Sequence, residues 1–229
     1  MFVCPLSDFL LEEADPWRGE LWAQIRERSD VDFYIQTKRV IRLLEPGILP
    51  SDWSDGYPNV YINATVDDPS SSEERLLALV EVPARHRVIA MCPTTTPLNL
   101  IPGLKTKKIQ QGYLIGEIGC GMDWTQLLKT TRPLRYEWVK DISEQFRTWT
   151  THFDFKGSGT IWIDKNGKKK ISTTLIDQFN IAQDCDLGVT GDSSDYTIAW
   201  GANHTEFITD WTDGQSTVLH GPRLSRVFY

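Results

Sequence analysis

The sequence predicts an α/β protein in which βα units surround a parallel sheet or barrel. Residues 32–39 (DFYIQTKR) begin as an apolar, strand-forming run and end at once in polar and cationic residues. The same design recurs along the chain, with helix-like sequence between the apolar runs. Ligands of such folds gather at the carboxyl ends of the strands, so a site is expected there.

Strands and helices are expected to alternate along most of the chain. The strands are expected at residues 2–6, 32–39, 60–66, 86–92, 113–118 and 153–156, with the prolines after Cys92 ending the fourth. The helices are expected at about residues 16–28, 40–44, 70–80, 136–149 and 177–186. In the first helix Asp15 is the expected N-cap. One face of that helix is expected to carry Trp17, Leu21, Ile25 and Arg28.

After Gly159 the pattern changes from βα units to β structure. Residues 160–173 predict a hairpin that turns at Asn166 and Gly167. From about Thr190 aromatic and polar residues alternate, which favours a β-rich extension. The aromatic side chains there form either the buried face of a small sheet or a stacking surface for a partner: Tyr196, Trp200, Phe207, Trp211, Phe228 and Tyr229. The expected division is residues 1–159 and a packed extension at 160–229.

Composition narrows the class of protein. The net charge is −7, with 31 acidic and 24 basic residues. This charge disfavours a protein that coats nucleic acid along its length, but it is compatible with a local basic groove. No apolar run approaches the roughly 18 residues that span a membrane, and the amino terminus does not resemble a signal peptide. The four cysteines are far apart without a CxxC pair, so we expect a reduced, cytoplasmic protein.

Polar side chains near the expected strand ends are the candidate site. They are Ser7, Asp8, Thr37, Lys38, Arg39, Asn63, Thr65, Glu117 and Lys156. The cations Lys38, Arg39 and Lys156 suit a phosphate or carboxylate. Asp8, Glu117 and Lys156 are the candidates for acid–base work. The alternative is that these side chains pair with one another across an inert mouth.

Metal binding is not expected. Cys4, Cys92 and Cys120 lie near strand ends, but isolated cysteines are commonly small buried hydrophobes. The four histidines show no HxH or HExxH spacing, and neither a Walker A sequence nor a GxSxG elbow is present.

Blocks that include FVCPLSDFL and DFYIQTKR lie at residues 2–39, 49–68, 82–100, 132–146, 153–170 and 177–189. In their order and spacing these blocks resemble a phage-type family of proteins of unknown function with a radical-SAM-like cysteine motif. The resemblance implies a partial (β/α) barrel of about six parallel strands. It also implies S-adenosylmethionine and an iron–sulfur cluster, but the clustered cysteines that would hold the cluster are absent here. No cofactor is therefore expected on this chain alone.

Two hypotheses about function follow. The first is a non-catalytic or partner-dependent barrel that binds a ligand, whose open edge a second chain or a second copy covers. The second is a stand-alone enzyme that acts on a phosphorylated or nucleotide-like substrate through the strand-end Asp, Glu, Lys and Arg residues. Nucleic acid as a partner is left open, and no membrane partner is expected.

Overall fold

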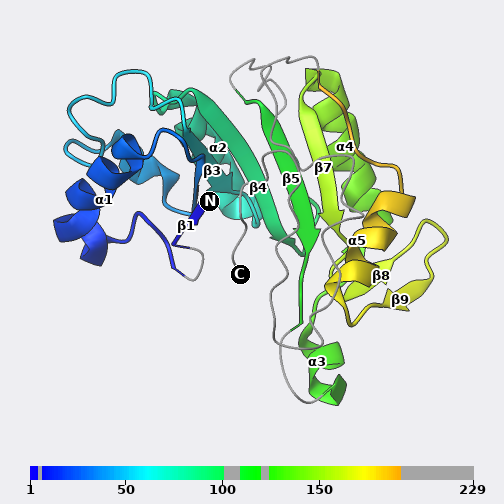
Figure 1. Cartoon of the computed structure of the whole chain (residues 1–229). Coiled ribbons are helices and arrows are strands. Elements are labelled where there is room, and N and C mark those ends of the chain that lie inside the picture. The colour runs from blue at the N-terminus through cyan, green and yellow to red at the C-terminus, as the bar shows by residue number, and fades with distance from the viewer. Residues whose placement is uncertain (5–6, 101–108, 120–123, 192–229) are drawn as a thin grey trace.

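The computed structural model describes residues 1–4, 7–100, 109–119 and 124–191, and it shows an α/β fold built on two sheets (Figure 1). The large sheet is parallel throughout, in the order β1-β2-β3-β4-β5-β7. Its strands are β1 (Phe2–Val3), β2 (Phe33–Thr37), β3 (Val60–Thr65), β4 (His86–Thr94), β5 (Gln111–Gly116) and β7 (His152–Gly157). The predicted six-stranded parallel sheet is thus confirmed. Its closure into a barrel stays a prediction.

The smaller sheet follows the order β6-β8-β9, with β6 (Leu134–Arg135), β8 (Ile161–Ile163) and β9 (Lys169–Ile171). Strands β8 and β9 are antiparallel, which confirms the predicted hairpin. Gly167 in its turn has φ of 76°, a value that favours glycine. The predicted β-rich extension from about Thr190 lies almost entirely outside the described residues, and the division at residue 159 stays a prediction.

One face of the large sheet carries the main hydrophobic core. The helices are α1 (Asp15–Glu27), α2 (Pro69–Glu81), α3 (Trp124–Thr130), α4 (Tyr136–Trp149) and α5 (Leu175–Asp184), with short 3₁₀ turns η1 (Glu12–Ala14) and η2 (Val40–Leu44). Helices α1, α2, α4 and α5 all place buried apolar side chains in this core. In Figure 1, α2 and α4 lie behind the strands. The opposite face, here called the second face, carries a separate small cluster around Val88, Ala90 and Tyr113.

The first helix differs from its prediction in two ways. Asp15 is not the N-cap but the first helical residue, and its carboxylate binds Arg18 and Arg42 instead. The buried face is Arg18, Trp22 and Ile25, whereas Trp17 is 61% exposed. The reason is the aromatic packing of Trp22, whose ring contacts those of Phe9, Trp53 and Tyr57. That packing rotates the helix by about one residue from the expected orientation.

Two further expectations are corrected. Strand β1 ends at Val3, and β4 continues through a cis Cys92–Pro93 bond to Thr94 rather than ending at the prolines. Helix α3 and strand β6 were not predicted. Among the described residues, no helix combines the length and apolar character that crossing a membrane requires.

We predict that Gly112→Ala destabilises the fold. A Cβ at Gly112 would overlap the ring of Phe146, which is fully buried where α4 packs on β5. Overpacking of this kind costs about 1–3 kcal/mol of unfolding free energy, measurable by urea denaturation. Gly19→Ala is the control, because Gly19 lies on the exposed side of α1 with no atom near its Cβ position. That change should stabilise by up to about 1 kcal/mol. Equal effects from the two substitutions would contradict the packing argument.

Candidate functional site

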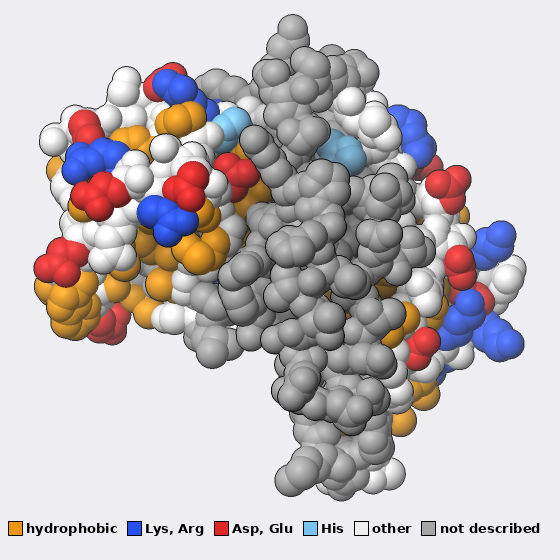
Figure 2. All heavy atoms as spheres, viewed as in Figure 1, with side chains coloured by type: hydrophobic (Ala, Val, Ile, Leu, Met, Phe, Trp, Pro, Cys, Tyr) orange, Lys and Arg blue, Asp and Glu red, His pale blue; other side chains and the backbone are white. Residues whose placement is uncertain are grey.

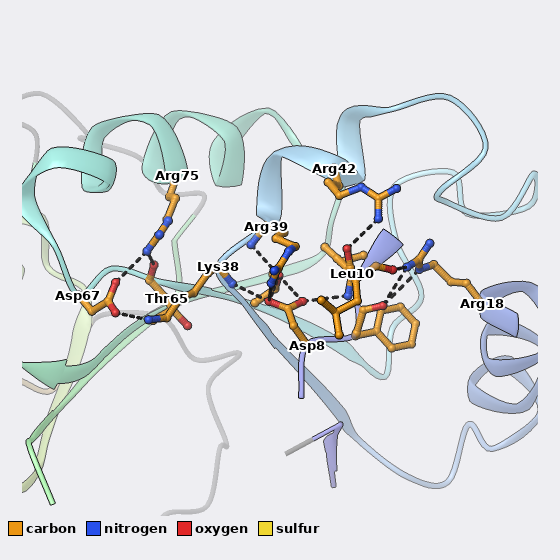
Figure 3. A network of polar contacts seen from close by, with 12 residues as sticks. Asp8, Leu10, Arg18, Lys38, Arg39, Arg42, Thr65, Asp67 and Arg75 are labelled. Atoms are coloured by element: carbon orange, nitrogen blue, oxygen red, sulfur yellow. Dashed lines mark hydrogen bonds and ion pairs between the residues drawn. The ribbon is translucent and has the colours of Figure 1, made fainter. Parts of the chain in front are cut away.

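The carboxylate of Asp8 joins the segment after β1 to the carboxyl end of β2 (Figure 3). It accepts hydrogen bonds from the Thr37 hydroxyl at 2.8 Å and from the backbone N–H groups of Leu10 and Lys38 at 2.9 and 3.1 Å. Arg39 Nη1 also lies 3.2 Å from its Oδ2. A short side chain with several backbone and side-chain donors is held rigidly, so Asp8 fixes where the residues after β2 begin.

Lys38 and Arg39 follow β2 and leave it in different directions. Lys38 Nζ binds Asp67, which follows β3, whereas Arg39 turns back to Asp8 (Figure 3). Asp67 is also bound by Arg75 of α2 at 2.8 Å, and Arg75 donates to the Thr65 carbonyl at 2.9 Å. Burial alone would raise the pKa of Asp67, but the bonds from Lys38 and Arg75 hold it below its usual value. Asp67 is therefore ionised at neutral pH.

A second ion pair lies after β5. Glu117 accepts from the backbone N–H of Arg132 at 2.6 Å and from its guanidinium at 2.9 Å. These bonds lower the pKa of Glu117 and raise the pKa of Arg132, to which the charge of Asp67 also contributes. The Lys38–Asp67 pair is therefore close enough to the Glu117–Arg132 pair for their charges to interact. We call Asp8, Lys38, Arg39, Asp67, Arg75, Glu117 and Arg132 the strand-end cluster.

The second face is ordered in rows that cross the strands. The first row is aromatic: Phe2, Tyr34, Tyr61 and His86 are register partners whose neighbouring rings lie 4.4–5.4 Å apart. The next row is Gln36, Asn63, Val88, Gln111 and His152, and the row after it is Thr65, Ala90, Tyr113 and Asp154. Polar side chains thus follow the aromatic row on this face, interrupted by the apolar cluster of Val88, Ala90 and Tyr113.

Lys156 lies on this face at the carboxyl end of β7. Its Nζ is 4.5 Å from the centre of the Tyr113 ring. Burial lowers the pKa of Lys156 to about 8, against contributions from Asp154 and Cys92 that raise it. Burial also raises the pKa of Cys92, as does the charge of Asp67, whereas the charges of Lys38 and Lys156 lower it. Cys92 is therefore where the second face meets the strand-end cluster.

Two amide side chains on the second face have buried atoms without a hydrogen-bond partner. Both amide atoms of Asn63 are in this state, as is Oε1 of Gln111, and each side chain is 1% exposed. Asn63 lies near Tyr113 and slightly opposes the rise that burial causes in the pKa of that phenol. The Tyr113 hydroxyl, however, donates to Gln36 at 2.9 Å, and no bond of acceptable geometry reaches Asn63.

Most of the predicted site residues fall into these two regions. Asp8, Thr37, Lys38 and Arg39 are in direct contact, Glu117 belongs to the neighbouring pair, and Asn63, Thr65 and Lys156 are on the second face. Ser7 is exposed, and its backbone N–H donates to the Cys4 carbonyl, so the structure does not bring it into the cluster.

Sequence reasoning missed several members: Asp67, Arg75, Arg132, Gln111, Tyr113 and Asp154. The alternation of His152, Asp154 and Lys156 along one strand could have identified Asp154, because alternate residues share a face. Arg75 and Arg132 lie outside the strands, and nothing in their local sequence indicates where they point.

The described residues do not bring metal ligands together. Among the described residues, no group of three His, Cys, Asp or Glu side chains could hold a metal ion. The described cysteines, Cys4, Cys92 and Cys185, are free thiols, and Cys120 lies outside the described part. The described residues therefore do not form the thiolate cage of an iron–sulfur cluster. The cofactor expectation stays a prediction.

A cavity of about 340 Å³ lies elsewhere, between α1 and residues 46–50. Its buried polar groups are satisfied within the chain: Arg18 donates to the carbonyls of Phe9 and Leu11, and Trp22 donates to Ile48. The buried amide atoms without a partner are on the second face. We therefore place the candidate site there and in the strand-end cluster.

We predict that Asp8→Ala lowers the unfolding free energy by about 1–3 kcal/mol, because it leaves the donors of Leu10, Thr37 and Lys38 without their acceptor. Thermal and urea unfolding would measure the change. Asp30→Ala is the control, since Asp30 pairs only with Arg28 on the exposed surface in the described structure. Its effect should stay within about 0.5 kcal/mol.

We also predict that Lys156 reacts with an acylating reagent with a midpoint near pH 8. Asp154→Asn should lower this midpoint, because the Asp154 charge raises the pKa of Lys156. The folded pKa lies below the 10.5 of an ordinary lysine, so the contribution of Lys156 to stability should rise between pH 8 and 10.5. Labelling across pH, followed by peptide mass spectrometry with exposed Lys140 as reference, measures the midpoint. A rise of the midpoint in Asp154→Asn would contradict the assignment.

Comparison with known proteins places the chain in a family without giving an activity. No curated protein and no solved structure matches it. A family model described as "Protein of unknown function (DUF5131)" matches residues 1–183. This match spans the large sheet, the strand-end cluster and the hairpin. The chain therefore belongs to the DUF5131 family of proteins of unknown function.

Proposed function

We propose that the protein binds a small anionic ligand, carrying phosphate or carboxylate, at the strand-end cluster. The observation that carries the proposal is the convergence of four cations of this cluster with Lys156 of β7. Lys38 and Arg39 follow β2, Arg75 lies on α2 and Arg132 precedes β6. Four carboxylates accompany these five cations: Asp8, Asp67, Glu117 and Asp154. The ion pairs hold the cations in fixed positions, and guanidinium and ammonium groups are the usual phosphate donors.

The distribution of charge elsewhere supports a small ligand over an extended polyanion. Figure 2 shows basic and acidic side chains interspersed on both flanks of the face in view. A protein that coats nucleic acid presents one sign of charge over a large area. The cations of the strand-end cluster are instead enclosed by carboxylates, which suits a compact anion.

In this proposal the scaffold is a partial (β/α) barrel related to the radical-SAM-like proteins, without an iron–sulfur cluster of its own. The parallel order of six strands supports it. A second chain or a second copy covers the edge beside β1, which in the described structure pairs with β2 alone. The solution mass, with iron and sulfide assayed on the same sample, tests both parts. A monomer would contradict the covered edge, and stoichiometric iron with sulfide would contradict the missing cluster.

Lys156 favours a second candidate function, an enzyme that acts on a phosphorylated or nucleotide-like substrate. A lysine with a pKa near 8 is partly neutral at physiological pH and serves as a base or nucleophile. Its neighbours Asp154 and Cys92 are also titratable. Turnover of a phosphorylated compound that is lost in Lys156→Met, with binding retained, would favour this function over simple binding.

We predict that the protein binds inorganic pyrophosphate and that Lys38→Ala and Arg39→Ala each weaken binding about 10- to 100-fold. A hydrogen bond between charged groups contributes about 1.5–3 kcal/mol, which corresponds to this range. Isothermal titration calorimetry at low salt measures the affinity, which should fall as the ionic strength rises.

The matched control is Lys140→Ala. Lys140 is an exposed lysine on α4 whose carboxylate partner, Glu144, is 3.6 Å away. Its removal changes the net charge by the same amount as Lys38→Ala, so equal weakening by the two variants would show a general charge effect. Absence of pyrophosphate binding to the unaltered protein would overturn the anion site.

A further inference from the structure

The Asn63 amide is the least satisfied polar group among the described buried side chains. Its nitrogen and its oxygen are both buried without a partner, in a residue that is 1% exposed. A buried polar group in this state costs about 1–3 kcal/mol of stability. Native proteins satisfy nearly all such groups, so an exception asks for an explanation such as a ligand.

The neighbours of Asn63 are held in place by hydrogen bonds of their own. On one side, Gln36 accepts the Tyr113 hydroxyl at 2.9 Å. On the other, beyond Val88, Gln111 donates to Asp154 at 2.5 Å, which leaves its Oε1 without a partner. The unpartnered atoms are therefore one donor and two acceptors in a single row, on two strands separated by β4. Adjacent strands lie about 4.8 Å apart, so these amides are roughly 10 Å apart across the sheet.

The route from Asn63 to the cations of the strand-end cluster is short. Thr65 is two residues beyond Asn63 on the same side of β3, and Thr65 is paired with Ala90. Two residues along a strand span roughly 7 Å. Lys38 follows Thr37, the register partner of Ala64, and therefore lies level with Thr65. Thr65 and Ala90 are small, but the hydrogen bond from Tyr113 on β5 to Gln36 on β2 crosses β4 and β3 beside Asn63.

We infer that the ligand is a nucleoside monophosphate, whose phosphate binds Lys38 and Arg39 and whose base edge pairs with the Asn63 amide. The inference deepens the anion-binding function proposed above and depends on it. A side-chain amide offers one donor and one acceptor side by side, the arrangement that pairs with the edge of a nucleobase. The ribose takes the strip of Thr65 and Ala90, which requires Tyr113 to release Gln36 when the nucleotide binds. Gln111 Oε1 then accepts from a second donor of the base.

Binding is tested with AMP, GMP, CMP and UMP against ribose 5-phosphate and pyrophosphate by calorimetry. At least one nucleotide should bind at least 10-fold more tightly than ribose 5-phosphate, since one or two buried hydrogen bonds are gained. In Asn63→Leu this difference should disappear, while ribose 5-phosphate binds as before.

Stability of the free protein gives a readout that does not depend on the ligand. Asn63→Leu keeps the branched shape and removes both unpartnered atoms, so its melting temperature should rise. The matched control is Gln36→Met in the same row, which removes the acceptor of the Tyr113 hydroxyl and should lower the melting temperature. If Asn63→Leu does not fold, Asn63→Ala replaces it in the binding test.

The failures are distinguishable. If pyrophosphate binds but no nucleotide binds better than ribose 5-phosphate, the inference is overturned and the anion site stands. If pyrophosphate, ribose 5-phosphate and the nucleotides all fail to bind, the proposed function and the inference are both overturned. A fall in melting temperature for Asn63→Leu equal to that of Gln36→Met would show that the Asn63 amide is already satisfied in the free protein.

Discussion

The bonds that Asp8 accepts are the constraint on which the arrangement of the site depends. Asp8 follows the two-residue strand β1, and its carboxylate receives donors from Leu10, Thr37 and Lys38. These bonds fix the amino-terminal segment against the end of β2. They also set the direction in which the two cations after β2 leave the sheet. Without that anchor, Lys38 and Arg39 would be two flexible side chains on a loop, with no reason to meet Asp67 or to converge with Arg75.

The two faces of the large sheet differ in composition and packing. The face under α2 and α4 is apolar and closely packed, as in any α/β protein. The second face begins with stacked aromatic rings and ends with Lys156 and Cys92, and it contains amides without partners. Both the desolvated lysine and the unpartnered amides cost stability. Costs of this kind concentrate at functional sites, where the surrounding fold offsets them.

The sequence predicts the order of the elements well because each strand is a distinct apolar run. The helix spanning residues 136–149 and the hairpin at Asn166 and Gly167 were predicted correctly from local signals alone. The predicted face of α1 was right at Ile25 and wrong at Trp17. Trp17 and Trp22 are both plausible core residues, and only the partners Phe9, Trp53 and Tyr57 decide between them. The strand ends were predicted as the site, and four of its members are in contact. Arg75 and Arg132 were missed because their roles depend on distant carboxylates.

The ion pairs of the strand-end cluster do not prevent an anion from binding, because they differ in exposure. The side chains of Lys38 and Arg39 are 51% and 45% exposed, whereas their partners Asp67 and Asp8 are 15% and 13% exposed. Both carboxylates keep other donors, which are Arg75 on Asp67 and Leu10 and Thr37 on Asp8. An incoming phosphate therefore displaces little when it takes either cation. Arg75 is 18% exposed and is also bound to the Thr65 carbonyl, so it remains with Asp67 and neutralises it. Lys38 and Arg39 are thus the cations that leave their carboxylates for the phosphate. Arg75 stays paired with Asp67, so the negative charge of Asp67 remains balanced when the phosphate binds.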